Sequence, residues 1–337
     1  MKKPKYKVPD TKIPMEIRKA QVKLLSLTAR IGELSPYLRL MRPELYYMDL
    51  TLPASSAILA SYLATGGFPE FIPFLIAVIG GFAAITSSYV FNDCCDVDID
   101  KINLPGRPLP ASRISKNSAL SYACLLLVIA GAAAAYLNPE SLLTLVIAAA
   151  TITIYSIFAK RNTFLSFLPV GISYGLVPVG IWLAFDPAGL LKGSDAVILP
   201  LPAICFGLMI CVTDWAFTLG GVARDVKGDR LKGAPTMPVT FGIPFTARFV
   251  TFWWIVGVIA SVIIGWSARL GPVYFAGALG SGLWMLSQCV DFIRHPTPER
   301  GGMLFLNGSN YRAIMFGSMI LDVVLCIYAG TYTSILW

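Results

Sequence analysis

Long apolar stretches follow one another along most of this chain, and short charged or Pro- and Gly-rich segments separate them. An apolar stretch of about 20 residues can cross the hydrocarbon core of a bilayer as a helix. We therefore predict an all-α membrane protein, built as a bundle of nine transmembrane helices. The nine spans are expected near residues 45–65, 70–93, 118–137, 141–159, 164–185, 197–221, 246–267, 271–293 and 312–334.

The composition agrees with this pattern. The 337 residues are 56% hydrophobic and 14% charged, with a mean hydropathy of +0.68, whereas a soluble domain carries about 25% charged residues. The seven cysteines include no CxxC pair, so the sequence indicates neither a disulfide framework nor a thiolate metal site. These features exclude an ordinary soluble globular protein.

The first 43 residues form a basic, polar arm ahead of the predicted bundle. The arm has no short apolar core followed by a small-residue cleavage site, so it does not resemble a signal peptide. Residues 14–34 place apolar side chains at helical spacing, which suits either an interfacial helix or an ordinary cytosolic arm. Residues 44–337 contain no low-complexity linker and are predicted to form one transmembrane domain.

The distribution of Lys and Arg predicts the orientation of the bundle. Cytoplasmic segments of membrane proteins are enriched in these residues. If the N-terminus is cytoplasmic, nine spans place every Lys and Arg except Lys192 and Arg269 on the cytoplasmic side. The prediction is an integral, multi-pass membrane protein with a cytoplasmic N-terminus and the C-terminus on the opposite side.

Two acidic clusters stand out because each directly follows an apolar span. NDCCDVDID at 92–100 ends the second predicted span, and RDVKGDRLKG at 224–233 ends the sixth. Both spans have even numbers and run in the same direction, so both clusters are expected on the cytoplasmic side. Acidic residues at a helix C-terminus are unfavourable with the helix dipole, so capping does not explain them. The repetition predicts two helix ends that present carboxylates to one site.

Helical spacing groups the polar side chains of each cluster on one face. Residues four apart share a helix face, which brings together Asn92, Asp96 and Asp100 in the first cluster and Asp225 and Asp229 in the second. Carboxylates gathered in a medium of low dielectric constant repel one another, and a divalent cation removes this repulsion. Oxygen ligands without His or Cys select a hard ion such as Mg²⁺ or Ca²⁺.

Basic residues lie beside these carboxylates in the sequence. Asp93 adjoins the first acidic face, whereas Asp98 points away from it. Metal ions and basic side chains together neutralise a diphosphate, and no GxxxxGK[ST] or GxGxxG loop for a soluble nucleotide occurs. The diphosphate is therefore expected to belong to a lipid. The candidate residues that bind the diphosphate are Arg107, Arg113, Lys160, Lys227 and Arg230, with Arg224 and Lys232 close by.

These motifs resemble those of the UbiA superfamily of intramembrane prenyltransferases. NDCCDVDID is similar to the family's NDxxDxxxD motif, and DVKGD is similar to its second motif, DxxxD. NLPGRPLPASRIS, YSIFAKRNTFLSFLPVGISYG and GDRLKGAPTMPVTFG resemble three further segments in the family's order. The resemblance covers roughly residues 38–334 and implies nine helices around a central cavity that opens sideways to lipid.

The resemblance also implies a Mg²⁺-dependent reaction. An allylic prenyl diphosphate loses its diphosphate, and a lipophilic acceptor within the membrane attacks the allylic cation. Asn92, Asp96 and Asp100 would hold one Mg²⁺, and Asp225 and Asp229 would hold a second. Asp93 belongs to the same motif and is a further candidate ligand. Membrane lipid is an expected partner, and nucleic acid is not.

The candidate catalytic residues include one tyrosine and one lysine besides the aspartates. Tyr155 and Lys160 belong to the segment that resembles the family's Y-(S/T)-x-x-x-K pattern. By the motif match, Lys160 and Arg107 would contact the diphosphate. The full catalytic set is Asp96, Asp225, Lys160 and Tyr155.

The chain departs from the family pattern at two places. Ala111 precedes Ser112 where many members have a Ser-Gly pair, and Thr218 stands where many relatives carry a third acidic residue before DxxxD. Asp214 lies 11 residues before Asp225, about three helical turns away and on nearly the same face. It is a candidate to replace the third acidic residue or to assist deprotonation of the acceptor.

Two other functions remain open at this level. A terpene cyclase on the same scaffold begins with the same ionisation, so the motifs do not separate it from a transferase. A cation transporter would also use intramembrane carboxylates, but it does not explain the interleaved Arg and Lys. The segment GDRLKGAPTMPVTFG looks more like relatives that prenylate chlorophyllide or archaeal ether-lipid precursors than those that prenylate 4-hydroxybenzoate.

Overall fold

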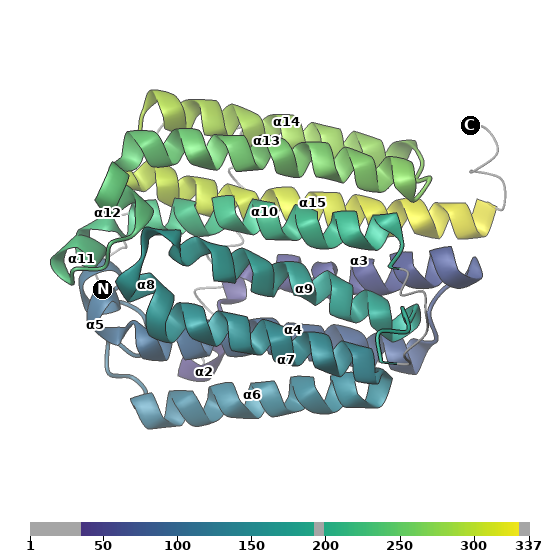
Figure 1. Ribbon diagram of the computed structural model, residues 1–337, viewed down its shortest axis with the longest axis horizontal. Helices are drawn as coiled ribbons and strands as arrows, with labels where there is room; N and C mark the ends of the chain where they lie inside the picture. The colour runs from purple at the N-terminus through teal and green to yellow at the C-terminus, as the bar shows by residue number, and fades with distance from the viewer. Residues whose placement is uncertain (1–34, 192–198, 330–337) are drawn as a thin grey trace.

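The long helices of the molecule lie side by side along one axis (Figure 1). The computed structural model describes residues 35–191 and 199–329, and within these ranges the chain forms helices and no strand. The long helices are α3 (Tyr46–Thr65), α4 (Phe71–Cys95), α6 (Lys116–Leu137), α7 (Pro139–Ile154), α9 (Phe167–Phe185), α10 (Leu201–Arg224), α13 (Ile243–Ser267), α14 (Pro272–Arg294) and α15 (Pro298–Ala329).

Short helical elements join the long ones. They are α2 (Pro36–Leu40), the 3₁₀ turn η1 (Pro43–Leu45), α5 (Val97–Asn103), the π-helical turn η2 (Tyr155–Ala159), α8 (Lys160–Asn162), the 3₁₀ turn η3 (Phe164–Ser166), α11 (Val226–Leu231) and α12 (Met237–Phe241). Helices suit a membrane because each satisfies its backbone hydrogen bonds internally. The interfacial helix considered for residues 14–34 lies outside the described residues.

Eight helices in the described ranges are long and apolar enough to cross a membrane. They correspond to predicted spans two to nine, with α7, η2 and α8 running together as one span, Pro139–Asn162. The helix at the first predicted span, α3, is 20 residues long, but Asp49, Pro53 and several Ser and Thr residues make it less apolar. The prediction of a multi-pass membrane protein is therefore confirmed, and the count of nine spans stays a prediction.

The last helix begins much earlier than the predicted span at 312–334. α15 starts at Pro298, and residues 330–334 lie outside the described residues. The glycines and polar residues of 298–311 look like a loop in the sequence. In the structure they allow close packing instead: a Cβ at Gly301 would lie 2.8 Å from Ala223 Cβ, and one at Gly308 would lie 2.8 Å from the ring of Trp254. Close packing against α10 and α13 thus accompanies helix formation in residues 298–311.

Three clusters of buried apolar side chains lie within the described part of the bundle. The largest lies mainly among α3, α9, α10, α13, α14 and α15, the second among α2, α4 and α6, and a small third one among α3, α4 and α9. Small residues let α9 and α10 approach closely, since a Cβ at Gly175 would lie 2.7 Å from the carbonyl oxygen of Gly207. Close contact between small residues is a common way to join transmembrane helices.

Candidate active site

An aspartate marks the end of α4, and another marks the end of α10. Asp96 joins α4 to α5 with φ −104° and ψ 10°, and Asp225 joins α10 to α11 with φ −91° and ψ 5°. The helical spacing expected for Asn92, Asp96 and Asp100 crosses this joint, because Asn92 lies on α4 and Asp100 lies on α5. The Asp100 amide still donates to the Asp96 carbonyl at 2.8 Å, so the turn continues across the joint.

The two joints lie at the same end of the bundle. Helices α5 and α11 pack against each other, and Figure 1 shows both at the left end of the molecule. The side-chain amide nitrogen of Asn103 on α5 donates to the Asp225 carbonyl at 2.8 Å. Acidic motifs more than 120 residues apart in the chain therefore meet at one place.

Lys160 lies against the first joint. Its Nζ atom donates to Asp96 Oδ2 at 2.5 Å, and both side chains are buried. The π-helical turn Tyr155–Ala159 directly precedes Lys160, and Tyr155 is buried at the start of that turn. Single π turns inside helices are often found at functional sites. The turn thus ends directly before the lysine that pairs with Asp96.

Arg107 bridges two carboxylates of the first motif. Its Nη1 atom donates to Asp93 Oδ1 at 2.9 Å and to Asp100 Oδ2 at 2.8 Å. Arg42 donates to the same Asp93 oxygen at 2.9 Å, and its guanidinium lies 4.4 Å from the centroid of the Tyr89 ring. Two arginines from separate segments of the chain thus converge on one Asp93 oxygen.

The second motif contains one paired carboxylate and one that is mostly unpaired. Arg224 donates to both oxygens of Asp225, at 2.8 and 2.7 Å. Asp229 has no exposed surface and accepts one hydrogen bond from Thr236 Oγ1 at 3.1 Å. The motif therefore holds one anion balanced by its neighbour and one buried carboxyl group with little support.

The pKa values reflect this contrast. Burial raises the pKa of Asp229 to about 6, although Lys160 opposes the shift. Burial also raises the pKa of Asp100, against the effect of Arg107. Burial would raise the pKa of Asp225 as well, but the Arg224 ion pair outweighs it and lowers that pKa. Burial thus disfavours the ionised forms of Asp229 and Asp100, and a nearby cation would stabilise them.

The polar atoms at this end suit a hard divalent cation. Asp96 Oδ1 and Asp229 Oδ1 are buried without a hydrogen-bond partner. Carboxylate oxygens with spare capacity are ligands that Mg²⁺ accepts, while water and substrate phosphate fill its other positions. Within the described residues, no three His, Cys, Asp or Glu side chains form a ready-made metal group. The donor chemistry fits a metal whose coordination a phosphate completes.

Three predicted basic residues are not drawn into this network. The side chains of Arg113, Lys227 and Arg230 are exposed, and no ion pair in the described ranges joins them to the carboxylates. They add positive charge around the site. Asp98 pairs with Arg161 at 2.7 Å, and the same guanidinium lies 4.0 Å from Asp96 Oδ1.

Two arginines that matter here escaped the sequence interpretation. Arg42 belongs to the basic arm in the sequence, and no motif there sets it apart from the other basic residues of that arm. Arg312 was placed in a cytoplasmic loop, which is wrong, since it lies inside α15 and is 1% exposed. Arg312 Nη1 donates to Asp214 Oδ1 at 2.9 Å. Thr218 Oγ1 donates to the other Asp214 oxygen at 3.4 Å.

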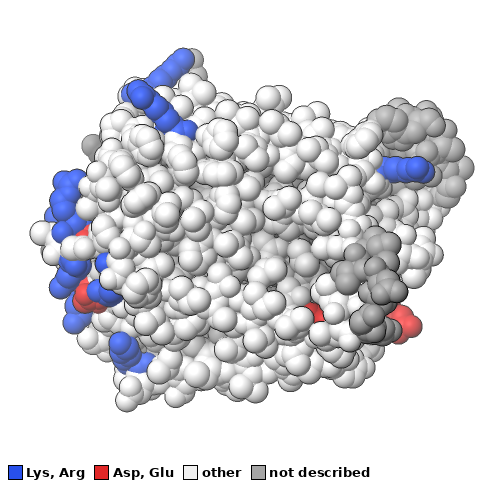
Figure 2. Space-filling view, viewed as in Figure 1, with Lys and Arg blue, Asp and Glu red and all other residues white. Residues whose placement is uncertain are grey.

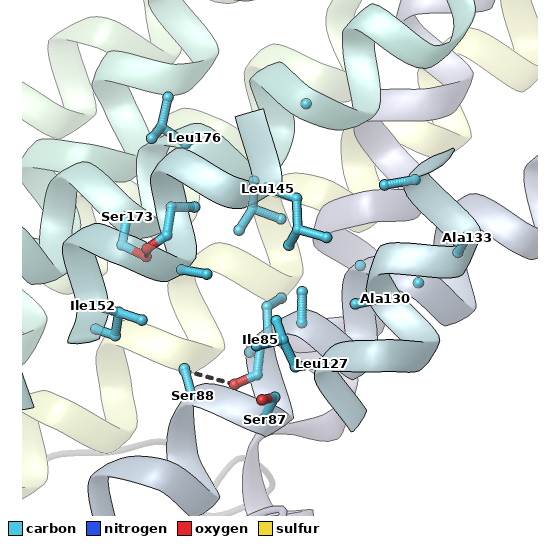
Figure 3. Close-up of a pocket in the computed structure, with 18 of the residues that line it drawn as sticks. Ile85, Ser87, Ser88, Leu127, Ala130, Ala133, Leu145, Ile152, Ser173 and Leu176 are labelled. Carbon is cyan, nitrogen blue, oxygen red and sulfur yellow. Dashed lines mark hydrogen bonds between the residues drawn. The ribbon is translucent and has the colours of Figure 1, made fainter. Parts of the chain in front are cut away.

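A cavity of about 200 Å³ lies between α4, α6, α7 and α9. It begins at Phe91, next to Asn92, and continues along α4 to Ala77, roughly 21 Å at the helical rise per residue. Its walls are mostly apolar, with serine hydroxyls at intervals (Figure 3). The cavity lies to one side of the bundle, so the central cavity implied by the resemblance stays a prediction.

The fold and the site define the class of this protein. It is a helical, multi-pass membrane protein with acidic and basic side chains interleaved at one end. The sequence model of the UbiA prenyltransferase family matches residues 54–319, and the chain belongs to this family. It is a UbiA-type prenyltransferase.

Individual relatives and solved structures agree with membership of this family. The chain is 26% identical over 270 residues to digeranylgeranylglyceryl phosphate synthase of Thermococcus sibiricus, which covers 80% of this chain and 90% of the relative. The fold is similar to that of a UbiA homologue from Aeropyrum pernix, with a TM-score of 0.65, 19% identity and coverage of 82% and 97%. It is also similar to a UbiA homologue from Archaeoglobus fulgidus bound to GPP and Mg²⁺, with a TM-score of 0.54, 16% identity and coverage of 85% and 99%.

Proposed function

We propose that this protein transfers a prenyl group from an allylic prenyl diphosphate to a lipophilic acceptor within the membrane, with two Mg²⁺ ions. The observation that carries the proposal is the pair of aspartate joints at one end of the bundle, each joined to a cation of the chain. Asp96 pairs with Lys160, and Asp225 pairs with Arg224. A lone carboxylate cluster would suit an ion transporter, whereas alternating charges suit a metal-bound diphosphate.

The residues proposed to hold the ions are Asn92, Asp93, Asp96 and Asp100 on one side and Asp225 and Asp229 on the other. A bound Mg²⁺ supplies Lewis-acid stabilisation of the negative charge that develops on the departing diphosphate. The solved homologue from Archaeoglobus fulgidus contains Mg²⁺ together with GPP, which supports a divalent ion at a prenyl diphosphate site.

Lys160 and Arg107 are proposed to bind the diphosphate directly. Each is positioned by carboxylates, Lys160 by Asp96 and Arg107 by Asp93 and Asp100. Prepositioned cations stabilise the charge on the leaving group without reorganising during the reaction. Tyr155 stands one π turn before Lys160 and helps to set the position of the lysine. Arg113, Lys227 and Arg230 contribute long-range attraction for the anionic head group.

The cavity beside α4 is proposed to hold the prenyl tail of the donor. It begins next to Asn92 and runs along α4 among apolar side chains, so a tail bound there leaves its diphosphate at the carboxylates. Apolar walls keep water from the allylic cation, which water would otherwise quench.

The acceptor is proposed to be a prenylated glycerol phosphate. The relative from Thermococcus sibiricus is named digeranylgeranylglyceryl phosphate synthase, and this product carries two geranylgeranyl groups on one glyceryl phosphate. The acceptor would then already carry one such group, and its free hydroxyl would attack the cation and release a proton. Asp214, paired with Arg312, stays the candidate for assisting that proton transfer.

Purified protein tests the proposal directly. Wild-type protein with a panel of allylic prenyl diphosphates should release diphosphate only when Mg²⁺ is present, and mass spectrometry should find a prenylated glycerol phosphate when that acceptor is added. Asp96→Asn and Asp225→Asn should each lower the rate by about 100-fold or more. The matched control is Asp98→Asn, because Asp98 belongs to the same motif but its side chain is 45% exposed and pairs with the partly exposed Arg161.

Three results would count against the proposal. Full turnover in Asp96→Asn and Asp225→Asn would remove the aspartate joints from the mechanism. A cyclic hydrocarbon or alcohol formed without acceptor would identify a terpene cyclase. Mg²⁺ transport across sealed vesicles without any prenyl diphosphate turnover would favour a transporter.

A further inference from the structure

The side chain of Asn103 links the two acidic motifs. Asn103 is the last residue of α5, three positions after Asp100. Its Nδ2 atom donates to the Asp225 carbonyl at 2.8 Å, and its Oδ1 atom accepts from the Gly228 amide at 2.9 Å. One planar amide thus makes two hydrogen bonds to the backbone of the opposite motif.

The backbone it contacts is the turn that carries both carboxylates of the second motif. Gly228 lies between Asp225 and Asp229, and its amide also donates to the Asp225 carbonyl at 3.1 Å. Asn103 therefore completes the first turn of α11 from outside. The asparagine therefore connects α5, which carries Asp100, to the turn that carries Asp225 and Asp229.

Gly228 provides the space for this contact. A Cβ at residue 228 would lie 2.7 Å from both Cγ and Oδ1 of Asn103 and still closer to Nδ2. Real Cβ atoms do not come so near to other heavy atoms, so any larger residue at 228 would displace the amide. The glycine and the asparagine form a matched pair across the joint between α5 and α11.

We propose that Asn103 is a positioning residue that sets the spacing between the two metal-binding motifs. The inference rests on the proposed function, since it assumes that the motifs act together on one metal–diphosphate group. The only described hydrogen bonds from this side chain go to backbone groups of the second motif, so it acts through the carboxylates and does not bind substrate. Residues that orient metal ligands typically affect metal affinity about 10- to 100-fold.

The test measures metal binding separately from catalysis. Isothermal titration calorimetry of the full chain in detergent, with Mg²⁺ and a non-hydrolysable prenyl diphosphate analogue, should show that Asn103→Ala binds Mg²⁺ about 10-fold or more weakly than wild type. At saturating Mg²⁺, kcat should recover most of its wild-type value. A merely structural loss would lower kcat at every Mg²⁺ concentration and lower the melting temperature without metal.

A double-variant cycle isolates the contact between the two residues. Gly228→Ala alone should weaken Mg²⁺ binding, because the new methyl group displaces the amide. Adding Gly228→Ala to Asn103→Ala should cause little further loss, because no amide is left to displace; residues in contact are expected to be non-additive in this way. The matched control is Asn117→Ala, an exposed asparagine at the start of α6, which should bind Mg²⁺ as wild type does.

The outcomes separate the inference from the proposed function. If wild type binds Mg²⁺ and Asn103→Ala binds it equally well, or if the two substitutions are additive, the inference is overturned while the proposed function stands. If wild type binds no Mg²⁺ with the analogue, both are overturned. Weakened binding with recovered kcat and non-additivity supports the inference.

Discussion

At the scale of single residues, buried charges are arranged in opposite pairs. Lys160 with Asp96, and Arg312 with Asp214, are the clearest cases, because all four side chains are almost fully buried. A buried ion pair gives little net stability, but removing one partner leaves an uncompensated charge in a medium of low dielectric constant. Such pairs therefore hold their carboxylates in defined positions and are costly to break.

Arg312 allows this reasoning to be tested away from the proposed metal site. Arg312→Met should lower the free energy of unfolding by about 3 kcal/mol or more, because it leaves the Asp214 carboxylate buried and unpaired. Thermal unfolding in detergent measures the change. The double variant Asp214→Leu with Arg312→Met should recover much of the stability.

The control for this prediction is a pair that is partly exposed to solvent. Arg300 contacts Asp291 at 2.6 Å, with side chains 17% and 30% exposed. Arg300→Met should change stability by about 1 kcal/mol or less. If Arg300→Met and Arg312→Met lowered the free energy of unfolding equally, the burial of the Arg312–Asp214 pair would not explain the loss.

At the scale of helices, small residues determine which elements approach and where space remains. α9 and α10 touch at Gly175 and Gly207, whereas α4, α6, α7 and α9 leave the cavity that begins beside Asn92. The same helices thus build a tight wall on one side and a hollow on another. The depth of that hollow is expected to set the length of prenyl tail that the protein accepts.

Filling the far end of the cavity should shorten the preferred donor. Ala134 on α6 lines the cavity, and Ala134→Phe would occupy the space beyond the first part of the tail. The expected result is retained turnover of short prenyl diphosphates and a loss of about 10-fold or more with long ones, since misplacing a substrate by about 1 Å already costs up to 100-fold. Competition between donors of different length, read by mass spectrometry, measures the change.

The matched control lies two residues away on the same helix. Ala132 is exposed on the outside of α6 and does not line the cavity. Ala132→Phe should leave the preference for donor length unchanged. Equal effects of both substitutions would place the tail elsewhere in the bundle.

At the scale of the whole molecule, charge is concentrated at the ends of the bundle. Figure 2 shows Lys and Arg gathered over the end that holds α5 and α11, with a broad uncharged surface between the two ends. This surface suits the hydrocarbon region of a bilayer. The basic end is expected to face the cytoplasm, so the diphosphate would arrive from the cytoplasmic side.

Labelling of introduced cysteines tests this orientation. Lys116, Lys232 and Arg269 are exposed; the first two lie in cytoplasmic segments of the predicted topology and the third on the opposite side. In sealed, right-side-out vesicles, a membrane-impermeant maleimide should label Arg269→Cys and should reach Lys116→Cys and Lys232→Cys only after the vesicles are opened. The parent protein supplies the background, and the reverse labelling pattern would invert the proposed topology.

Much of the architecture could be predicted from the sequence because the signals are local. Eight of the nine predicted spans coincide with helices that can cross a membrane, since each depends on a run of apolar residues. The site at the ends of α4 and α10 follows from two short motifs and from the even number of their spans. The sequence does not predict the beginning of α15, because its glycines and polar residues resemble a loop, whereas in the structure they pack closely against α10 and α13.

The sequence by itself thus determined the family, the apolar helices and the residue types of the proposed metal–diphosphate site. Only the tertiary structure decided how those residues are paired. Arg42 reaches Asp93 across 51 residues, and Asn103 reaches the second motif across more than 120. The physical reason is that hydropathy and motif spacing act within a few helical turns, whereas ion pairs and close contacts depend on which helices the folded bundle brings together.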